Sequence, residues 1–261
     1  AGHQVAAEEF QLTTFDYQSF SPNEKGKMAL AHKSKDLIVK GAGFELRFNK
    51  QTGYLYFMDF GQGNMLLHPM KANFWRPPTD NDFGFKMPEK WGIWKTITQR
   101  MSLAQLTVNG KSIETLKHSN LKTAKNRSVE LVALYDFPKT DGQLQITYTI
   151  NAKGDILVRN QLQSIPASYP NIPRVGNNLA FKKDYNQVEW YGRGPYENYQ
   201  DRKSASFVAQ YQSKVSDLYV PYIRPQENGL PIISSLATLM KAIKISNGIR
   251  TMYLRGQECF L

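Results

Sequence analysis

Three polar side chains follow one another near residue 80, and they form the densest group in the chain that could do chemistry. Asp80, Asn81 and Asp82 come after two prolines, and Arg76 precedes them. In an extended segment Asp80 and Asp82 share one face, with Cα atoms about 6.6 Å apart. That spacing permits a carboxylate pair of the kind used in acid/base chemistry.

A structural interpretation of the same residues is also open. Side chains of Asp and Asn commonly accept hydrogen bonds from nearby backbone amides in turns, and the two prolines favour a loop here. A guanidinium holds a carboxylate through two parallel hydrogen bonds, so we expect Arg76 to anchor the acidic residues as an ion-pair partner.

A second polar segment covers residues 188–202 and is followed by residues 216–229. We expect Glu197, Asn198, Asp201 and Arg202 to form a structural network that holds a long loop, because buried polar groups must be paired. The tyrosines of this region should be packed rings with hydrated hydroxyls. These rings belong to Tyr196, Tyr199, Tyr219 and Tyr222.

Composition limits the remaining possibilities. The four histidines are widely separated and Cys259 is the single cysteine, so we expect no metal site and no internal disulfide in the 261 residues. The 41% hydrophobic content indicates a folded protein. No apolar run is long enough for a membrane span and no signal peptide is recognisable, which leaves localisation open.

The net charge of +11 makes nucleic acid a partner class to consider. The basic residues are scattered, however, and the densest stretch, residues 25–50, is interrupted by Asp36 and Glu45. No recognisable nucleic-acid-binding motif accompanies them. We therefore expect an ordinary solvated surface and keep a nucleic-acid binder only as an alternative.

The elements that would position these groups are mainly strands. Alternating apolar residues predict strands at 44–48, 54–58, 111–116, 128–137, 142–150 and 156–162, with turn residues between them. Residues 49–53 predict a hairpin turn. Helical periodicity is scarce before residue 230. Strands at this spacing indicate an all-β antiparallel sandwich.

Four motifs give the sequence a family resemblance. They are Arg-Pro-Pro-Thr-Asp-Asn-Asp-x-Gly at 76–84, Gly-Pro-x-Glu-Asn-Tyr-x-Asp-Arg at 194–202, Ser-Asp-Leu-Tyr-x-Pro-Tyr at 216–222 and Pro-x-Glu-Asn-Gly at 225–229. In this order they resemble the C-terminal β-sandwich of glycoside hydrolase family two β-galactosidases, called the small chain.

The resemblance implies a domain organisation. Residues 1–20 would hold the last strand of an immunoglobulin-like domain, 21–35 a linker, 36–229 the sandwich, and 230–261 an atypical tail. The sandwich would be a large antiparallel supersandwich, similar in fold to galactose mutarotase, although no histidine–glutamate pair here matches mutarotase chemistry.

The resemblance also implies a function. In the family, two glutamates of a central (β/α)₈ barrel hydrolyse β-galactosides by a retaining mechanism, and that barrel binds Mg²⁺ and Na⁺. The barrel would lie upstream, so no catalytic residue, metal or cofactor is expected in this chain. Its expected partners are the barrel, the galactoside and, in an assembled enzyme, further copies.

A movable loop near the barrel mouth follows the first motif in the family. Here it would run from Gly84, whose backbone freedom suits a hinge, to Trp91. The resemblance therefore implies that Arg76, Asp80, Asn81, Asp82, Gly84 and Trp91 lie at the substrate rim. Met87, Pro88 and Trp94 would add apolar surface, although core packing is the competing interpretation for each tryptophan.

The tail departs from the family pattern after Gly229. Leu236, Leu239, Met240 and Ile243 have helical spacing behind a serine cap, and the family's sugar-stacking tryptophan has no counterpart. We expect this tail to come from a truncated or out-of-frame gene. Resequencing around the Gly229 codon tests that expectation. A stand-alone carbohydrate-binding module is the alternative function.

Overall fold

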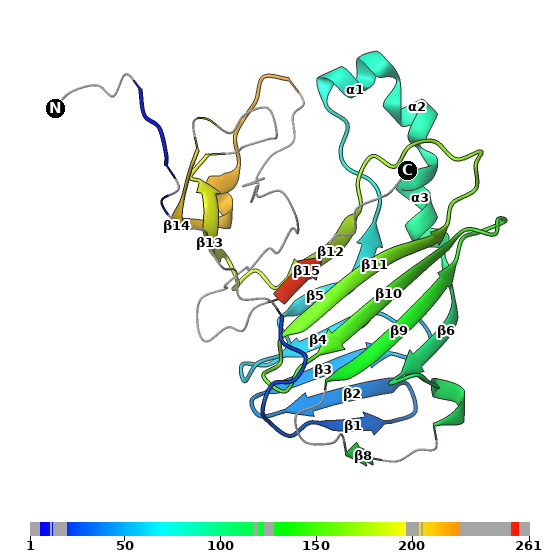
Figure 1. The fold of residues 1–261 in the computed structure, drawn as a ribbon. Coiled ribbons are helices and arrows are strands. Elements are labelled where there is room, and N and C mark those ends of the chain that lie inside the picture. Colours follow the sequence, from blue (N-terminus) through cyan, green and yellow to red (C-terminus); the bar gives the residue numbers. More distant parts are fainter. Residues whose placement is uncertain are drawn as a thin grey trace.

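Two β-sheets packed face to face make up the body of the protein (Figure 1). The computed structural model describes residues 6–10, 12, 20–116, 120–122, 128–196, 204, 206–224 and 252–255. The first sheet has the strand order β4-β3-β2-β1-β8, and the second has the order β15-β11-β10-β9-β6-β7. The prediction of an all-β sandwich is confirmed.

The two main sheets and two smaller ones contain every described strand. The strands of the first sheet are β1 (Ala29–His32), β2 (Asp36–Gly41), β3 (Phe44–Asn49), β4 (Leu55–Asp59) and β8 (Asn120–Lys122). Those of the second are β6 (Ser102–Val108), β7 (Lys111–Ser112), β9 (Val129–Asp136), β10 (Gln143–Ile150), β11 (Ile156–Ser164) and β15 (Met252–Arg255). The two-stranded sheets pair β5 (Leu66–Asn73) with β12 (Gly176–Phe181), and β13 (Gln187–Gly194) with β14 (Phe207–Lys214).

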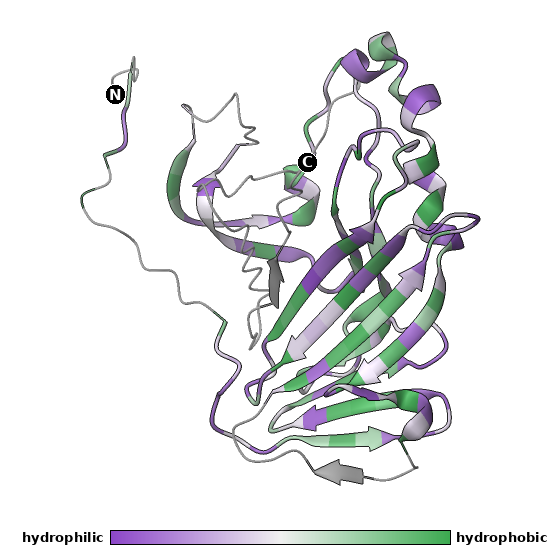
Figure 2. Cartoon of the chain, turned by 45° about the vertical axis from the view of Figure 1, so that its right-hand side comes forward, coloured by the Kyte–Doolittle hydropathy of each residue, from purple (hydrophilic) through white to green (hydrophobic). Residues whose placement is uncertain are grey.

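Strict alternation of apolar and polar residues explains the second sheet (Figure 2). Leu144, Ile146, Tyr148 and Ile150 of β10 are fully buried, and the residues between them are partly exposed. β9 follows the same rule. Because side chains alternate across a strand, this pattern places one apolar face against the first sheet.

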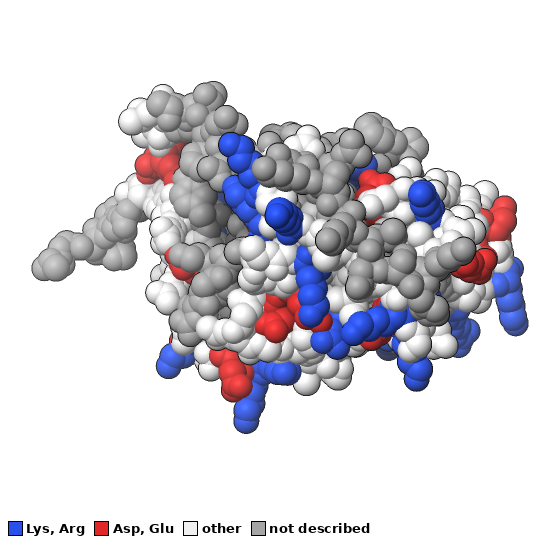
Figure 3. Space-filling view, turned by 90° about the horizontal axis from the view of Figure 1, so that it is seen from below, with Lys and Arg blue, Asp and Glu red and all other residues white. Residues whose placement is uncertain are grey.

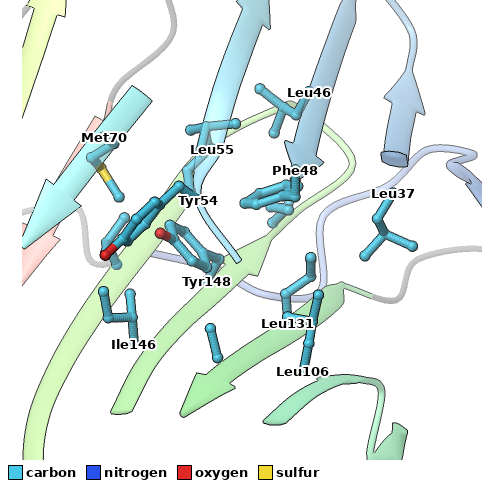
Figure 4. Packing of buried hydrophobic residues seen from close by; sticks show 14 of the residues in the cluster. Leu37, Leu46, Phe48, Tyr54, Leu55, Met70, Leu106, Leu131, Ile146 and Tyr148 are labelled. Atoms are coloured by element: carbon cyan, nitrogen blue, oxygen red, sulfur yellow. The ribbon is translucent and has the colours of Figure 1, made fainter. Parts of the chain in front are cut away.

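Aromatic pairs join the two sheets in the core (Figure 4). Phe48 of β3 meets Tyr148 of β10 edge to face, with ring centroids 5.0 Å apart. Tyr54 stacks on Tyr135 of β9 at 5.2 Å. Burial raises the pKa of the Tyr135 phenol, whose hydroxyl donates to the Thr52 carbonyl at 2.8 Å. These contacts tie the β3–β4 turn to the opposite sheet.

The predicted hairpin at residues 44–58 is confirmed. Asn49 Oδ1 accepts hydrogen bonds from the backbone amides of Gln51 and Thr52. Gly53 has a φ of +69°, and a Cβ there would lie 2.5 Å from the Tyr135 hydroxyl. Glycine is required at this turn for both its conformation and its small size.

Several expectations about organisation need correction. β1 lies inside the range that we expected to be a linker, because the buried Leu30 joins the core. Residues 6–10 and 12 are not in a strand, and most of the other residues of the strand expected within 1–20 lie outside the described part of the chain. Only β7 of the strand expected at 111–116 forms, and a 3₁₀ turn, η1 (Ile113–Thr115), follows it. Every described strand pair is antiparallel except β11–β15.

Three short helices lie before residue 230, where helical periodicity in the sequence is scarce. α1 (Asp80–Phe85), α2 (Met87–Trp91) and α3 (Ile93–Arg100) follow one another above one end of the sandwich (Figure 1). A 3₁₀ turn, η2 (Val215–Leu218), follows β14. The helix expected at 234–246 lies outside the described residues. Among those that the structure describes, no helix is long and apolar enough to cross a membrane.

Candidate functional site

Residues 76–100, called the helical arm below, hold most of the residues that we expected at a substrate rim. The expected ion pair is present and bidentate. Arg76 Nη1 and Nη2 donate to the two carboxylate oxygens of Asp82 at 2.5 and 2.9 Å. Thr79 donates to Asp82 Oδ2 from its backbone amide at 2.7 Å and from its hydroxyl at 2.9 Å. Asp82 therefore fastens the start of α1 to the incoming chain.

The electrostatics of Asp82 agree with this structural role. Burial of the carboxyl acts to raise its pKa, but the hydrogen bonds from Arg76 and Thr79 outweigh burial and hold the pKa of Asp82 below its ordinary value of 3.8. The carboxylate also sits in the first turn of α1, where negative charge is favourable. Asp82 is thus an ionised anchor whose oxygens are occupied by protein donors.

The three acidic and amide residues do not converge as a carboxylate pair. Residues 80–82 lie in α1 instead of an extended loop, so Asp80 and Asp82 point to different sides of a helix. Asp80 Oδ2 pairs with Arg224 Nη1 at 3.1 Å, and Asn81 is exposed. The carboxylate pair that an extended segment would permit is therefore not formed, because residues 80–82 are helical.

The Asp80–Arg224 pair brings two distant segments together. Arg224 follows the Ser-Asp-Leu-Tyr-x-Pro-Tyr motif, and Asp80 belongs to the first motif. Sequence reasoning missed Arg224, which is 75% exposed, because nothing in the sequence relates residues 144 positions apart. The contact places residues 219–224 beside the helical arm.

The expected hinge at Gly84 is not supported by its backbone. Gly84 lies within α1, and its Cβ position is open, so alanine would fit there. The left-handed residue of the arm is Lys86, with φ 61° and ψ 39°, between α1 and α2. A non-glycine residue in this conformation stores strain, which makes Lys86 the better hinge candidate.

The apolar residues of the arm divide into two groups. Met87 and Trp94 are fully buried, and Trp94 Nε1 donates to the Pro170 carbonyl at 2.9 Å. Trp94 also meets Phe74 edge to face at 5.7 Å. Both residues are therefore core side chains, and the sugar-facing surface that we considered for them is excluded.

The second group is exposed or half-buried, and we call its contacting pair, Phe85 and Trp91, the apolar arm face. Phe83, Phe85 and Ile93 are 55%, 47% and 38% exposed, and Trp91 is half-buried. Trp91 packs edge to face on Phe85 at 5.2 Å, while Lys90 Nζ lies 3.9 Å from the Phe85 ring centroid. Exposed apolar residues grouped in this way are typical of interaction surfaces.

The structure describes part of the second polar segment. Glu197, Asn198, Asp201 and Arg202 lie outside the described residues, as does Tyr199. Tyr196 and Tyr219 are 70% and 69% exposed, so the expectation that they are packed rings was wrong. Within the described ranges, no three His, Cys, Asp or Glu side chains are grouped as metal ligands.

Charge on the described surface is mixed. Figure 3 shows lysine and arginine side chains interspersed with aspartate and glutamate over the face that it presents. Several of the basic residues are paired, including Lys40 and Arg47, which both bind Glu45. Their proximity lowers the pKa of Glu45 despite burial, which acts in the opposite direction.

Comparison with known proteins places these features in a family. The family model for the β-galactosidase small chain matches residues 40–243. The match extends beyond Gly229, where we expected the resemblance to stop, and it includes the whole helical arm. It covers most of the sandwich together with hairpin β13–β14.

Curated relatives agree with the family match. The chain is 28% identical to a β-galactosidase of Priestia megaterium over 235 residues, 88% of this chain and 21% of the relative. It is 32% identical to a β-galactosidase of Vibrio cholerae over 237 residues, 88% of this chain and 22% of the relative. The matched part thus spans about a fifth of each relative.

Proposed function

Because the chain belongs to the β-galactosidase small-chain family, we propose that it is the C-terminal portion of a β-galactosidase that hydrolyses terminal β-galactosides. The names of the relatives support this activity, and their length supports a larger parent enzyme. In that enzyme the catalytic barrel supplies the reacting groups. This portion shapes the rim of the active site.

Asp80 and Asp82 of the arm are both paired with protein groups, which supports assigning catalysis to the barrel and positioning to this chain. A retaining glycosidase needs two carboxyl groups about 5 to 5.5 Å apart on either side of the glycosidic bond. Asp82 is held by Arg76 and Thr79, and Asp80 is held by Arg224. Arm carboxylates engaged in this way are suited to positioning, and we assign the acid/base and nucleophile to the barrel.

The apolar arm face is the observation that carries the rim role. Phe85 is 47% exposed and packs on the half-buried Trp91, and α1 is anchored by two ion pairs, so the position of this pair is defined although Phe85 is not buried. A surface with an apolar centre and basic and acidic residues around it suits a protein interface. We propose that it contacts the barrel beside the substrate.

A complementation experiment tests this function. The purified chain is assayed with a chromogenic β-galactoside, alone and mixed with a barrel-containing fragment that lacks the C-terminal domain. We expect activity only in the mixture. Activity of the chain alone would overturn the assignment of catalysis to the barrel, and an inactive mixture would overturn the complementing role.

Matched variants test the rim role itself. Phe85→Ser should raise the concentration needed for complementation about tenfold, since it removes an exposed contact of about 1.4 kcal/mol. Leu67→Ser is the control, because Leu67 is 58% exposed on β5, outside the helical arm. Equal effects of the two substitutions would exclude the apolar arm face as the contact surface.

The alternative function, a carbohydrate-binding module, makes a different prediction. It requires the isolated chain to bind galactose or lactose, with Trp91 and Phe85 as the aromatic surface. Tryptophan fluorescence titrated with lactose distinguishes the two functions. Saturable binding that is lost in Trp91→Ala would favour the module.

A further inference from the structure

The β13–β14 hairpin is a small unit with its own aromatic cluster. Trp190, 4% exposed, stacks on Tyr211 at 5.4 Å, and its Nε1 donates to the Arg193 carbonyl at 3.1 Å. The Tyr211 hydroxyl donates to the Phe207 carbonyl at 2.9 Å. These contacts hold the hairpin together. The backbone N–H and C=O groups along the outer edge of β14, on the side away from β13, need hydrogen-bond partners from other groups.

A carboxylate from the N-terminal segment meets that edge. Glu9 Oε1 accepts a hydrogen bond from the Val208 backbone amide at 2.7 Å, across 199 positions of sequence (Figure 1). Backbone N–H groups of a strand point alternately to its two sides. The Val208 amide therefore points away from β13, on the side where β14 pairs with no strand among the described residues.

Arg193 provides the second half of the binding site. Its Nη1 lies 3.7 Å from Glu9 Oε2 and donates to the Ser206 carbonyl at 2.6 Å. Ser206 is buried, and Arg193 and Glu9 side chains are 25% and 32% exposed. One carboxylate oxygen accepts a hydrogen bond from a backbone amide, and the other lies within ion-pair distance of a guanidinium.

We propose that the edge of β14 that no other described strand pairs, together with Arg193, is an acceptor site for a carboxylate-bearing extended segment, and that residues 6–10 occupy it through Glu9. An unpaired strand edge is a template for pairing with another chain. The docked segment occupies the Val208 amide and places negative charge at the edge. It therefore holds the hairpin in place and blocks strand addition by a second copy.

The neighbouring glutamate offers a matched control. Glu8 has the same charge and lies one residue away, but it is exposed and has no described partner. A general effect of negative charge near the N-terminus would make Glu8 and Glu9 equivalent. A specific docking site requires that only Glu9 matters.

Amide hydrogen exchange in the full chain tests the proposal. Glu9→Ala should speed exchange of the Val208 amide about tenfold, because a hydrogen bond to a charged group is lost, and Glu8→Ala should leave it unchanged. Glu9→Gln, which keeps an acceptor oxygen, should fall between them. Equal exchange in Glu9→Ala and Glu8→Ala would overturn the docking site.

Two further readouts separate docking from misfolding and test edge protection. Tryptophan fluorescence should be the same in all three variants, since a shifted spectrum in Glu9→Ala would mean that the fold around the tryptophans, Trp190 of the hairpin among them, has changed. Sedimentation should show stronger self-association for Glu9→Ala than for Glu8→Ala. Unchanged association with a deprotected Val208 amide would overturn the blocking role.

Discussion

The sandwich core and the helical arm lie in one chain but are stabilised by different interactions. The core is a continuous apolar cluster from both sheets, in which residues such as Phe48, Leu46 and Ile146 are fully buried. The outer part of the arm is held by the Arg76–Asp82 and Asp80–Arg224 ion pairs and exposes aromatic side chains. Burial of apolar side chains stabilises the sandwich core, and a few ion pairs and hydrogen bonds stabilise the outer part of the arm.

This difference separates the stability of the fold from the placement of the arm. Loss of a core side chain should lower the free energy of global unfolding, because the two sheets share a single cluster. Loss of an arm anchor should open only α1 and α2, since local opening needs only the local contacts to break. The predictions below measure whether the two regions behave in this way.

The two arm tryptophans provide the largest expected contrast. Trp94→Ala should lower the free energy of unfolding by about 3 to 5 kcal/mol, because it removes a fully buried ring that contacts Phe74 and Tyr169. Trp91→Ala should cost about 1 kcal/mol, since Trp91 is half-buried. Urea denaturation measures both, and equal losses would show that Trp91 belongs to the core.

The Asp82 anchor should give a local effect. Asp82→Asn weakens the bidentate pair and should lower the free energy of local opening of α1 by about 1 to 2 kcal/mol, which speeds amide exchange there. The free energy of global unfolding should change little. Arg76→Gln should act in the same direction. A fall in global stability as large as that of Trp94→Ala would contradict the separation of the two regions.

The same anchor predicts a pH dependence. The pKa of Asp82 is lowered in the folded protein, so its stabilising contribution is complete above the ordinary value of 3.8 and is lost as pH falls through the folded value. Protection of the α1 amides, measured relative to the intrinsic exchange rate at each pH, should therefore fall over this acidic range in the wild type. Asp82→Asn should show a weaker dependence, and identical profiles would exclude Asp82 as the titrating group.

Two glycines of the arm test the hinge. Gly84→Ala should stabilise α1 by about 0.5 to 1 kcal/mol, because its Cβ position is open and alanine favours helix. Gly92→Ala should destabilise the arm, since a Cβ there would lie 2.4 Å from the Pro88 carbonyl oxygen. Destabilisation by Gly84→Ala in amide exchange would restore Gly84 as a conformational hinge.

The exposed ion pair should have the smallest effect on stability. Arg224→Gln should change the free energy of unfolding by less than about 0.5 kcal/mol, because Arg224 is 75% exposed and solvent screens the pair. Crosslinking of residues 219–224 to the arm should nevertheless decrease. An unchanged crosslinking yield would show that Arg224 does not position this segment.

Strands were predicted more accurately than the arm. Alternation of buried and exposed residues located β3, β4, β9, β10 and β11 within a few residues, because sheet packing requires that pattern. The arm helices are only five to eight residues long and contain Gly84, Pro88 and Gly92, which obscure helical periodicity. Thr79 three residues before Asp82 and proline near the start of α2 were the available signals.

The sequence by itself determined the family, the sandwich and the ion pair between Arg76 and its acidic neighbours. All three follow from residues that are close together in the sequence. The motifs and the alternation of apolar and polar residues are local patterns, and Arg76 is only six residues from Asp82. Only the tertiary structure decided that Trp94 is core, that Asp80 meets Arg224 and that Glu9 meets Val208. Contacts across 76, 144 and 199 positions depend on how the sheets and segments pack, and no local pattern specifies them.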